Sequence, residues 1–239
     1  MASASRDQRQ RALWPEVLEV VLNLPALNAF LTELKFNNSK AWFDENRGRY
    51  GLLRQEFISF MDEVIAGVAV NDPSVTAVRA QDTLFRINRD VRFTQDKAPY
   101  KTSFSAAISP GGRHSSLPVY YVQIGPDESF VGGGVHVPPP DDLRVIRDYI
   151  ERFPGKADAL LEHPALARSF GGLAKEGVLQ RFPRGFGEAS ELLKFKSFTV
   201  SADFEAVAQQ DLVAFIAGKC GAMQPLHAWL REALAYRKP

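Results

Sequence analysis

A change in the spacing of apolar residues near position 73 constrains the fold more than any other feature of this sequence. From Phe43 to Val68, apolar residues recur every three or four positions, which predicts an amphipathic helix of about seven turns. Ser39 is the predicted N-cap, and Asn71-Asp72-Pro73 ends the pattern. A shorter helical stripe precedes it and ends at Asn37-Asn38. The first third of the chain is therefore predicted to be helical.

After this helix the pattern becomes an alternation of apolar and polar residues, as in strands buried on one face. Phe85 and Ile87, for example, alternate with Arg86. Tight turns are predicted at 110–112 and 125–127. Successive short strands joined by tight turns favour an antiparallel meander. The predicted strands are 75–80, 83–88, 102–109, 119–124 and 130–137.

Helical spacing returns after the three prolines at 138–140, and Asp141 is the predicted cap of the next helix. The strand-like segment 197–201 is predicted to cross back to the sheet. Segregated runs of helix, sheet and helix predict an α+β fold. It has N-terminal helices including one long amphipathic helix, a central mainly antiparallel sheet, then C-terminal helices. We expect one domain over 1–239, with a partly flexible segment at 1–25. Further helices are predicted at 157–161, 165–170, 211–219 and 225–236.

Composition excludes several classes of function. Lysine plus arginine number 29 and aspartate plus glutamate 28, so no whole-molecule positive field favours nucleic acid. Cys220 is the one cysteine, and we interpret it as a small core residue; neither a disulfide, a structural zinc site nor a cofactor is predicted. The first residues lack the apolar core of a signal peptide, and the apolar stretch 17–24 is too short to span a bilayer. We therefore expect a soluble, cytoplasmic protein with no membrane partner.

The segment 86–101 is the strongest candidate for chemistry. It holds five basic and two acidic residues within a nearly neutral chain. Because the planar guanidinium of arginine matches phosphate and carboxylate groups, the segment predicts a small anionic ligand. A three-residue step along a strand changes face, so the three arginines converge only if the chain turns at 88–90. The predicted ligand-binding residues are Arg86, Arg89, Arg92, Lys97, Tyr100 and Lys101.

The two acidic residues of this segment, Asp90 and Asp96, have two interpretations. They orient the arginines toward a ligand, or they pair with the arginines and brace neighbouring strands. Coordination of a cation by both aspartates is opposed by the surrounding positive charge, so no metal is predicted.

Three classes of function stay open from the sequence. The first is an anion-binding module or an enzyme that uses the arginines to stabilise negative charge. The second, less favoured by the near-zero net charge, is a binder of nucleic-acid backbone in which Phe85, Phe93 and Tyr100 stack bases. The third is a structural or protein-interaction role with no ligand. Protein partners are not predicted, and whether the chain is an enzyme stays open.

Glycines and histidines add weaker signals. Gly132-Gly133-Gly134 indicates either a tight crossing, where a side chain would clash, or a place where a ligand approaches the backbone. His136 follows this run and is a possible general base, with His114 a less favoured one. We interpret His227, among apolar residues near the C-terminus, as structural.

Four segments carry a resemblance to a known family. They are NNSKAWFDENRGRY (37–50), FRINRDVRFTQDKAPYKTSF (85–104), the run 120–150 that begins YYVQIGPDESFVGGG, and RFPRGF (181–186). Together they make the chain similar to the family catalogued as domain of unknown function 2461, from about residue 27 to beyond residue 196. The family has no established activity to carry over, so the resemblance implies kinship and leaves function open.

Overall fold

The computed structural model describes residues 22–112 and 117–236. Three helices come first: α2 (Leu24–Phe36), α3 (Lys40–Glu45) and α4 (Arg47–Asn71). Ser39 caps α3 as predicted, its hydroxyl accepting a hydrogen bond from the Trp42 amide at 3.4 Å. The helical stripe is continuous in sequence, but the helix is interrupted at Asn46, whose side-chain amide donates to the Trp42 carbonyl at 3.0 Å. The long amphipathic helix is therefore α4 alone.

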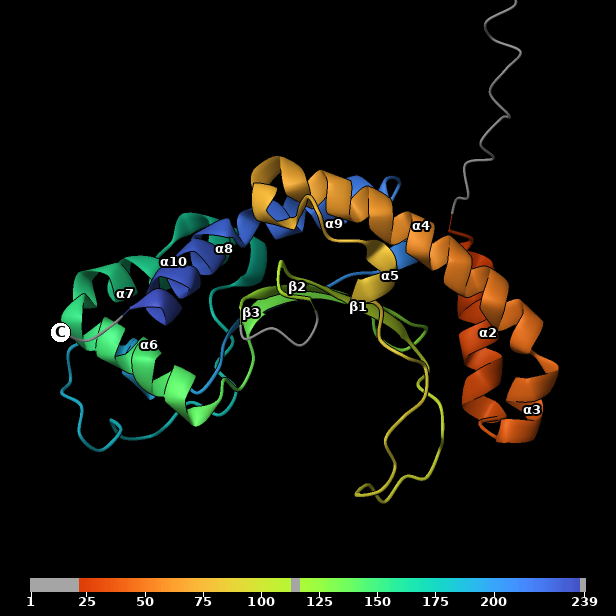
Figure 1. Cartoon of the computed structure of the whole chain (residues 1–239), viewed down its shortest axis with the longest axis horizontal. Helices are drawn as coiled ribbons and strands as arrows, with labels where there is room; N and C mark the ends of the chain where they lie inside the picture. Colours follow the sequence, from red (N-terminus) through yellow and green to blue (C-terminus); the bar gives the residue numbers. More distant parts are fainter. Residues whose placement is uncertain (1–21, 113–116, 237–239) are drawn as a thin grey trace, which may run out of the picture.

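The sheet contains β1 (Phe104–Ile108), β2 (Val119–Ile124), β3 (Phe130–Val135) and β4 (Phe198–Asp203). The strands lie in the order β1-β2-β3-β4 and every neighbouring pair is antiparallel, which confirms the predicted meander and the return of the segment near 197–201. In Figure 1, α4 runs along one face of the sheet, while residues 85–103 extend away from it as a long arm.

The two strands predicted before this sheet are wrong. The chain forms a 3-10 turn, η2 (Pro73–Val75), and then the short helix α5 (Ala80–Thr83). Local capping explains the turn, because the Asp72 carboxylate accepts a hydrogen bond from the Ser74 amide at 3.3 Å. Beyond α5, two isolated bridges are the only β-pairing of the described residues before Phe104, joining Leu84 to Ala106 and Asn88 to Tyr100.

After β3 the chain is mainly helical, with the irregular segment 171–190 and β4 between the helices. Helix α6 (Pro140–Arg152) begins two residues earlier than predicted, at Pro140, so Asp141 lies in its first turn instead of capping it. There its negative charge still complements the helix dipole. The remaining elements are α7 (Pro154–Leu161), α8 (Pro164–Phe170), η3 (Glu191–Lys194), η4 (Ala206–Ala208), α9 (Leu212–Ala222) and α10 (Gln224–Ala235).

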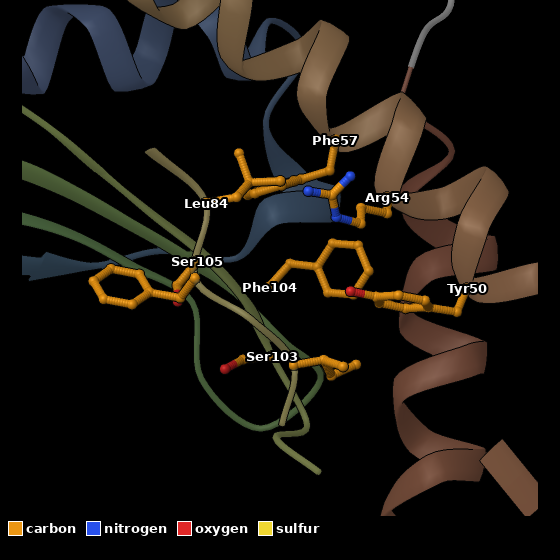
Figure 2. Close-up of a pocket in the computed structure, with 9 residues that line it drawn as sticks. Tyr50, Arg54, Phe57, Leu84, Ser103, Phe104 and Ser105 are labelled. Carbon is orange, nitrogen blue, oxygen red and sulfur yellow. The ribbon is translucent and has the colours of Figure 1, made fainter. Parts of the chain in front are cut away.

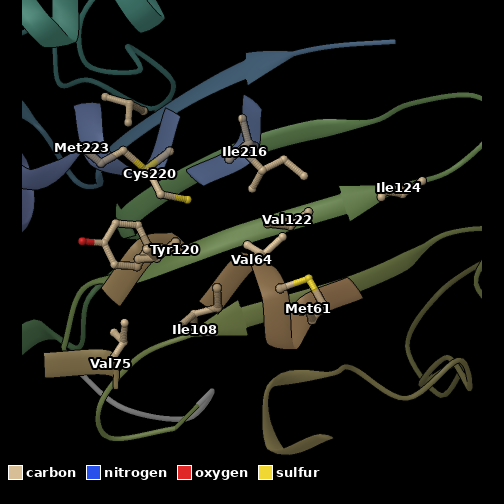
Figure 3. Close-up of a cluster of buried hydrophobic side chains, with 14 of the residues drawn as sticks. Met61, Val64, Val75, Ile108, Tyr120, Val122, Ile124, Ile216, Cys220 and Met223 are labelled. Carbon is tan, nitrogen blue, oxygen red and sulfur yellow. The ribbon is translucent and has the colours of Figure 1, made fainter. Parts of the chain in front are cut away.

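One face of the sheet, which we call the covered face, is buried under α4 and α9. Figure 3 shows side chains of β2 meeting Met61 and Val64 from α4 and Ile216 from α9. Because side chains alternate along a strand, Tyr120 and Val122 lie on the covered face and Tyr121 lies on the opposite, open face. Cys220 is fully buried in the same core, as predicted, and burial raises the pKa of its thiol to about 12.

Both outer strands of the sheet are partly hydrogen-bonded on their outer edges by segments that are not strands. Along β1, the Phe85 amide donates to the Ser105 carbonyl at 2.9 Å. Along β4, the Ala174 amide donates to the Thr199 carbonyl at 2.8 Å. These bonds satisfy edge groups that would otherwise face solvent.

Candidate functional site

The arm, residues 85–103, is anchored at its base. The Lys101 amide donates to the Ile87 carbonyl at 2.8 Å, which holds the two chains of the arm together. Asn38, between α2 and α3, accepts from the Tyr100 amide at 3.0 Å and donates to the Tyr100 carbonyl at 2.9 Å. The Tyr100 ring stacks on Phe43 with centroids 4.1 Å apart, and Tyr100 is only 6% exposed. Tyr100 therefore fixes the arm to the helices, and its packed ring is not free to stack a base.

Two of the predicted arginines, Arg89 and Arg92, bind different carboxylates. The chain continues past 88–90 as an extended pair of segments, so the turn required there is absent from the described arm. Arg92 instead binds the Asp90 carboxylate through Nε at 3.0 Å and Nη2 at 2.7 Å. The hydrogen bond from Arg92 holds the pKa of Asp90 below its ordinary value. Both side chains are exposed, and this ion pair is expected in both interpretations of the aspartates.

Two further predicted residues are also bound within the arm. Arg89 forms an ion pair with Asp96 and donates to the Ala98 carbonyl at 3.2 Å. Lys97 donates through Nζ to the Val91 carbonyl at 2.9 Å. Much of the local positive charge is therefore neutralised or hydrogen-bonded by the arm itself.

Arg86 and Lys101 differ from these residues. Within residues 22–112 and 117–236, neither forms an ion pair with a carboxylate. Lys101 is partly buried, with Nζ 5.1 Å from the centroid of the Phe85 ring. Burial lowers the pKa of Lys101, and the nearby charge of Arg86 lowers it further. Arg86 also helps to lower the pKa of Asp90 without pairing with it. Two cations thus lie near one another at the base of the arm.

Lys101 lines an open pocket between the arm and the helices, which we call the arm-base pocket. Its volume of about 500 Å³ is within the range of small-molecule sites, roughly 300–1,000 Å³. Three cationic side chains line it against one carboxylate, and of these Lys35 pairs with Asp127 at 2.7 Å. The lining consists of Lys35, Asn38, Arg89, Asp96, Ala98, Tyr100, Lys101 and Thr102.

A smaller pocket lies on the other side of the arm's base. Figure 2 shows Arg54 of α4 extending toward Leu84 and Phe104, next to the hydroxyl of Tyr50. Its space of about 10 Å³ is enough for a single water molecule. Burial raises the pKa of Tyr50, and the charge of Arg54 partly opposes this change. This pocket is a packing feature and is too small for a ligand.

The open face of the sheet carries a hollow of about 390 Å³, which we call the sheet trough. Tyr121, Gly132 and Ser201 are register partners on β2, β3 and β4, so the glycine leaves a gap between two side chains. His136, the predicted base, lines the trough together with Glu176. The other lining residues are Val119, Phe130, Gly133, Gly134, Ala174, Thr199 and Val200. His114, the less favoured base, lies outside the described residues.

The glycine run is explained by close strand packing. A Cβ atom at Gly132 would lie 2.6 Å from the Val200 carbonyl oxygen, and one at Gly134 would lie 2.0 Å from that of Phe198. Gly134 also has a φ of 113°, which side chains disfavour. The predicted tight crossing is therefore present, and the same glycines form the floor of the sheet trough.

A buried polar cluster on the covered face was missed by the sequence reasoning. Asp72, only 3% exposed, accepts a hydrogen bond from the Tyr120 hydroxyl at 2.8 Å and forms an ion pair with Arg231. Ser74 donates to the same carboxylate at 2.6 Å, and Gln224 donates to the Tyr120 hydroxyl at 2.8 Å. Asp72, Ser74, Tyr120, Gln224 and Arg231 form what we call the Asp72 cluster. It ties the end of α4 to β2 and α10.

The surroundings of this cluster keep Asp72 ionised and Tyr120 protonated. Burial alone would raise the pKa of Asp72, but hydrogen bonds from Ser74, Arg231 and Tyr120 hold it well below its ordinary value. Burial raises the pKa of Tyr120 far above its ordinary value, and the bond to Asp72 adds to this effect. His227 packs on Tyr120 at 4.0 Å, and burial lowers the pKa of its imidazole to about 3. His227 is therefore neutral and structural, as predicted.

Two features are absent from residues 22–112 and 117–236. Among them, no three His, Cys, Asp or Glu side chains gather in a way that could hold a metal ion. None of their helices combines the length and apolar character needed to cross a membrane.

Comparison with known proteins identifies a family. Comparison with curated proteins and with solved structures gives no match. A family model agrees with the resemblance seen in segments 37–50 and 85–104. That model, described as a conserved hypothetical protein (DUF2461), matches residues 26–229, and the chain therefore belongs to this family.

Proposed function

We propose that the protein binds a small anionic ligand, bearing phosphate or carboxylate, in the arm-base pocket. The observation that carries this proposal is the position of Lys101 in the pocket lining with Arg86 nearby, outside the lining. Neither cation forms an ion pair with a carboxylate in the described chain. Holding like charges together is unfavourable unless an anion balances them. An anion bound between them would remove this repulsion.

The other residues of the arm and the pocket have supporting roles in this proposal. Arg89 lies in the pocket wall with its guanidinium held by Asp96 and Ala98, so Asp96 orients it toward the ligand. Asp90 holds Arg92 in the same way further along the arm. The hydroxyl of Thr102 adds a donor beside Lys101. Tyr100 contributes through its anchored backbone, while Arg92 and Lys97 add long-range positive charge.

Titration calorimetry with inorganic phosphate and with acetate tests the proposal. A hydrogen bond to a charged group contributes about 1.5–3 kcal/mol, so Lys101→Met should weaken binding roughly 10- to 100-fold. Arg86→Gln should weaken it by a similar or smaller factor. Arg79→Gln is the matched control, because this exposed guanidinium already pairs with Asp82 and does not line the pocket.

Affinity should also fall as the pH rises through the pKa of Lys101, which burial places below the ordinary value for lysine. A folded wild-type protein that binds neither anion would overturn the proposal. Unchanged affinity in a folded Lys101→Met variant would overturn it equally.

A further inference from the structure

We infer that the ligand carries a flat, polar-edged aromatic ring besides its anionic group, as a nucleoside monophosphate does, and that this ring lies in the sheet trough. This inference rests on the proposed function and adds the chemical class of the ligand. It places the anion at Lys101 and the ring on the open face of the sheet.

Three aromatic rings connect the two places. The amine of Lys101 lies 5.1 Å from the Phe85 ring centroid, and Phe85 lies 5.9 Å from Tyr121. Tyr121 in turn stacks on Phe130 with centroids 5.3 Å apart and planes at 26°. Tyr121 and Phe130 both line the sheet trough. The distance from the Lys101 amine to the Tyr121 ring centroid is therefore no more than the sum of 5.1 Å and 5.9 Å. This span is comparable with one mononucleotide.

The shape of the sheet trough suits a flat group. Tyr121 forms one wall and Ser201 the other, and Gly132 between them contributes no side chain to the floor. A ring lying in the trough would contact the stacked pair Tyr121 and Phe130, and stacking of a base on aromatic side chains contributes about 1–3 kcal/mol. Bulky side chains at the floor are excluded by the Val200 carbonyl, which a Cβ atom at Gly132 would approach to 2.6 Å. The hollow is therefore a built-in consequence of how β3 pairs with β4.

The polar groups around the sheet trough favour a ring with donors and acceptors at its edge. Thr199 and Ser201 present hydroxyl groups, while Glu176 and His136 lie in the same lining. An aliphatic chain would cover these groups without hydrogen bonds, which costs free energy for each group left unpaired. A nucleobase instead offers amino and carbonyl groups at its edge and a π face for Tyr121. The aromatic side chains and the polar side chains of the sheet trough therefore favour the same class of ligand.

Calorimetric titrations with four probes test this inference: inorganic phosphate, ribose 5-phosphate, adenosine, and a panel of the four nucleoside 5′-monophosphates. The best mononucleotide should bind about tenfold or more tightly than phosphate, as one stacked base predicts. It should also bind more tightly than ribose 5-phosphate and adenosine, because each lacks one of the two contacts.

Variants assign the two contacts separately. Ser201 is exposed on the open face, so Ser201→Trp should fill the trough without removing packing. It should reduce the affinity for the best mononucleotide to that for phosphate and leave phosphate binding unchanged. Ala77→Trp, at an exposed position between η2 and α5, is the matched control and should change neither. Lys101→Met should weaken the binding of both phosphate and mononucleotide.

The outcomes separate this inference from the proposed function. Equal affinities for phosphate and for every mononucleotide, both lost in Lys101→Met, would overturn the ring assignment and leave the anion site standing. If adenosine bound as tightly as its monophosphate, the inference that one ligand occupies both the anion site at Lys101 and the sheet trough would be overturned. Absence of phosphate and mononucleotide binding would overturn both proposals. Far tighter binding of a ten-residue oligoadenylate, with a steep dependence on salt, would favour a nucleic-acid polymer over the small ligand.

Discussion

Tyr120 and Tyr121 are neighbours on β2, yet their surroundings have little in common. Tyr120 is fully buried on the covered face, and its hydroxyl is held by Asp72 and Gln224. Tyr121 is partly buried on the open face, where its hydroxyl donates to Gln123 at 3.1 Å and its ring forms one wall of the sheet trough. The same strand therefore secures the fold with one set of alternate residues and leaves the other set available for a ligand.

Substitution of each tyrosine is the strongest test of this contrast. Tyr120→Ala should lower the free energy of unfolding by about 3–5 kcal/mol, the usual cost of removing a fully buried aromatic ring. Tyr121→Ala should lower it by less than about 2 kcal/mol, because that ring is already in partial contact with water. Denaturant unfolding followed by circular dichroism measures both. Equal losses in the two variants would mean that the open face carries as much of the stability as the covered face.

The ion pairs Asp72–Arg231 and Asp90–Arg92 extend the comparison between a buried and an exposed site. Arg231→Met should destabilise the protein by about 2–3 kcal/mol, since it leaves the buried Asp72 carboxylate without its cation. The loss stays below the range for fully buried pairs because Arg231 is 30% exposed. Arg92→Met, which breaks the exposed pair with Asp90, should leave the unfolding midpoint unchanged. A clear loss of stability in Arg92→Met would show that the arm contributes to the fold.

The pH dependence of stability tests the covered face through His227. Its pKa is about 3 in the folded protein and near 6.5 when unfolded, so the unfolded state binds the proton first. The contribution of neutral His227 to the free energy of unfolding is therefore fully present well above pH 6.5. It falls as the pH drops, by about 2 kcal/mol between pH 6.5 and 4.5. Asp72, whose pKa is depressed, adds a further loss only below about pH 4. Urea unfolding at a series of pH values measures this dependence. In His227→Gln the free energy of unfolding should change less between pH 6.5 and 4.5 than in the wild type. A wild-type free energy of unfolding that stays constant over this range would contradict the assignment.

Sequence patterns predicted the parts of the fold that are governed by local periodicity. β2 matches its predicted bounds because alternation of buried and partly buried residues is preserved along its whole length. The predicted strand at 75–80 is wrong because Asp72 and Pro73 begin a turn, and a capping residue followed by proline is a local signal that the β-branched residues obscured. Capping chemistry outweighed strand propensity there.

The candidate site was predictable only where charge is concentrated in one segment. The basic segment drew attention to Lys101 and Arg86, but the self-pairing of Arg92 with Asp90 depends on side-chain geometry that spacing does not show. The Asp72 cluster lay beyond prediction because Tyr120 and Arg231 are 48 and 159 residues away in sequence. The sheet trough likewise requires the register of three strands.

The hydrogen bonds on the outer edges of β1 and β4 limit how other proteins can bind this one. A peptide that joined the sheet by strand addition would have to compete with Phe85 at one edge or Ala174 at the other. Displacing Phe85 would pull the arm from its base and disturb Lys101. Recognition of a protein partner should therefore use side chains on the helices or the arm, because main-chain pairing with the sheet would disturb the proposed anion site.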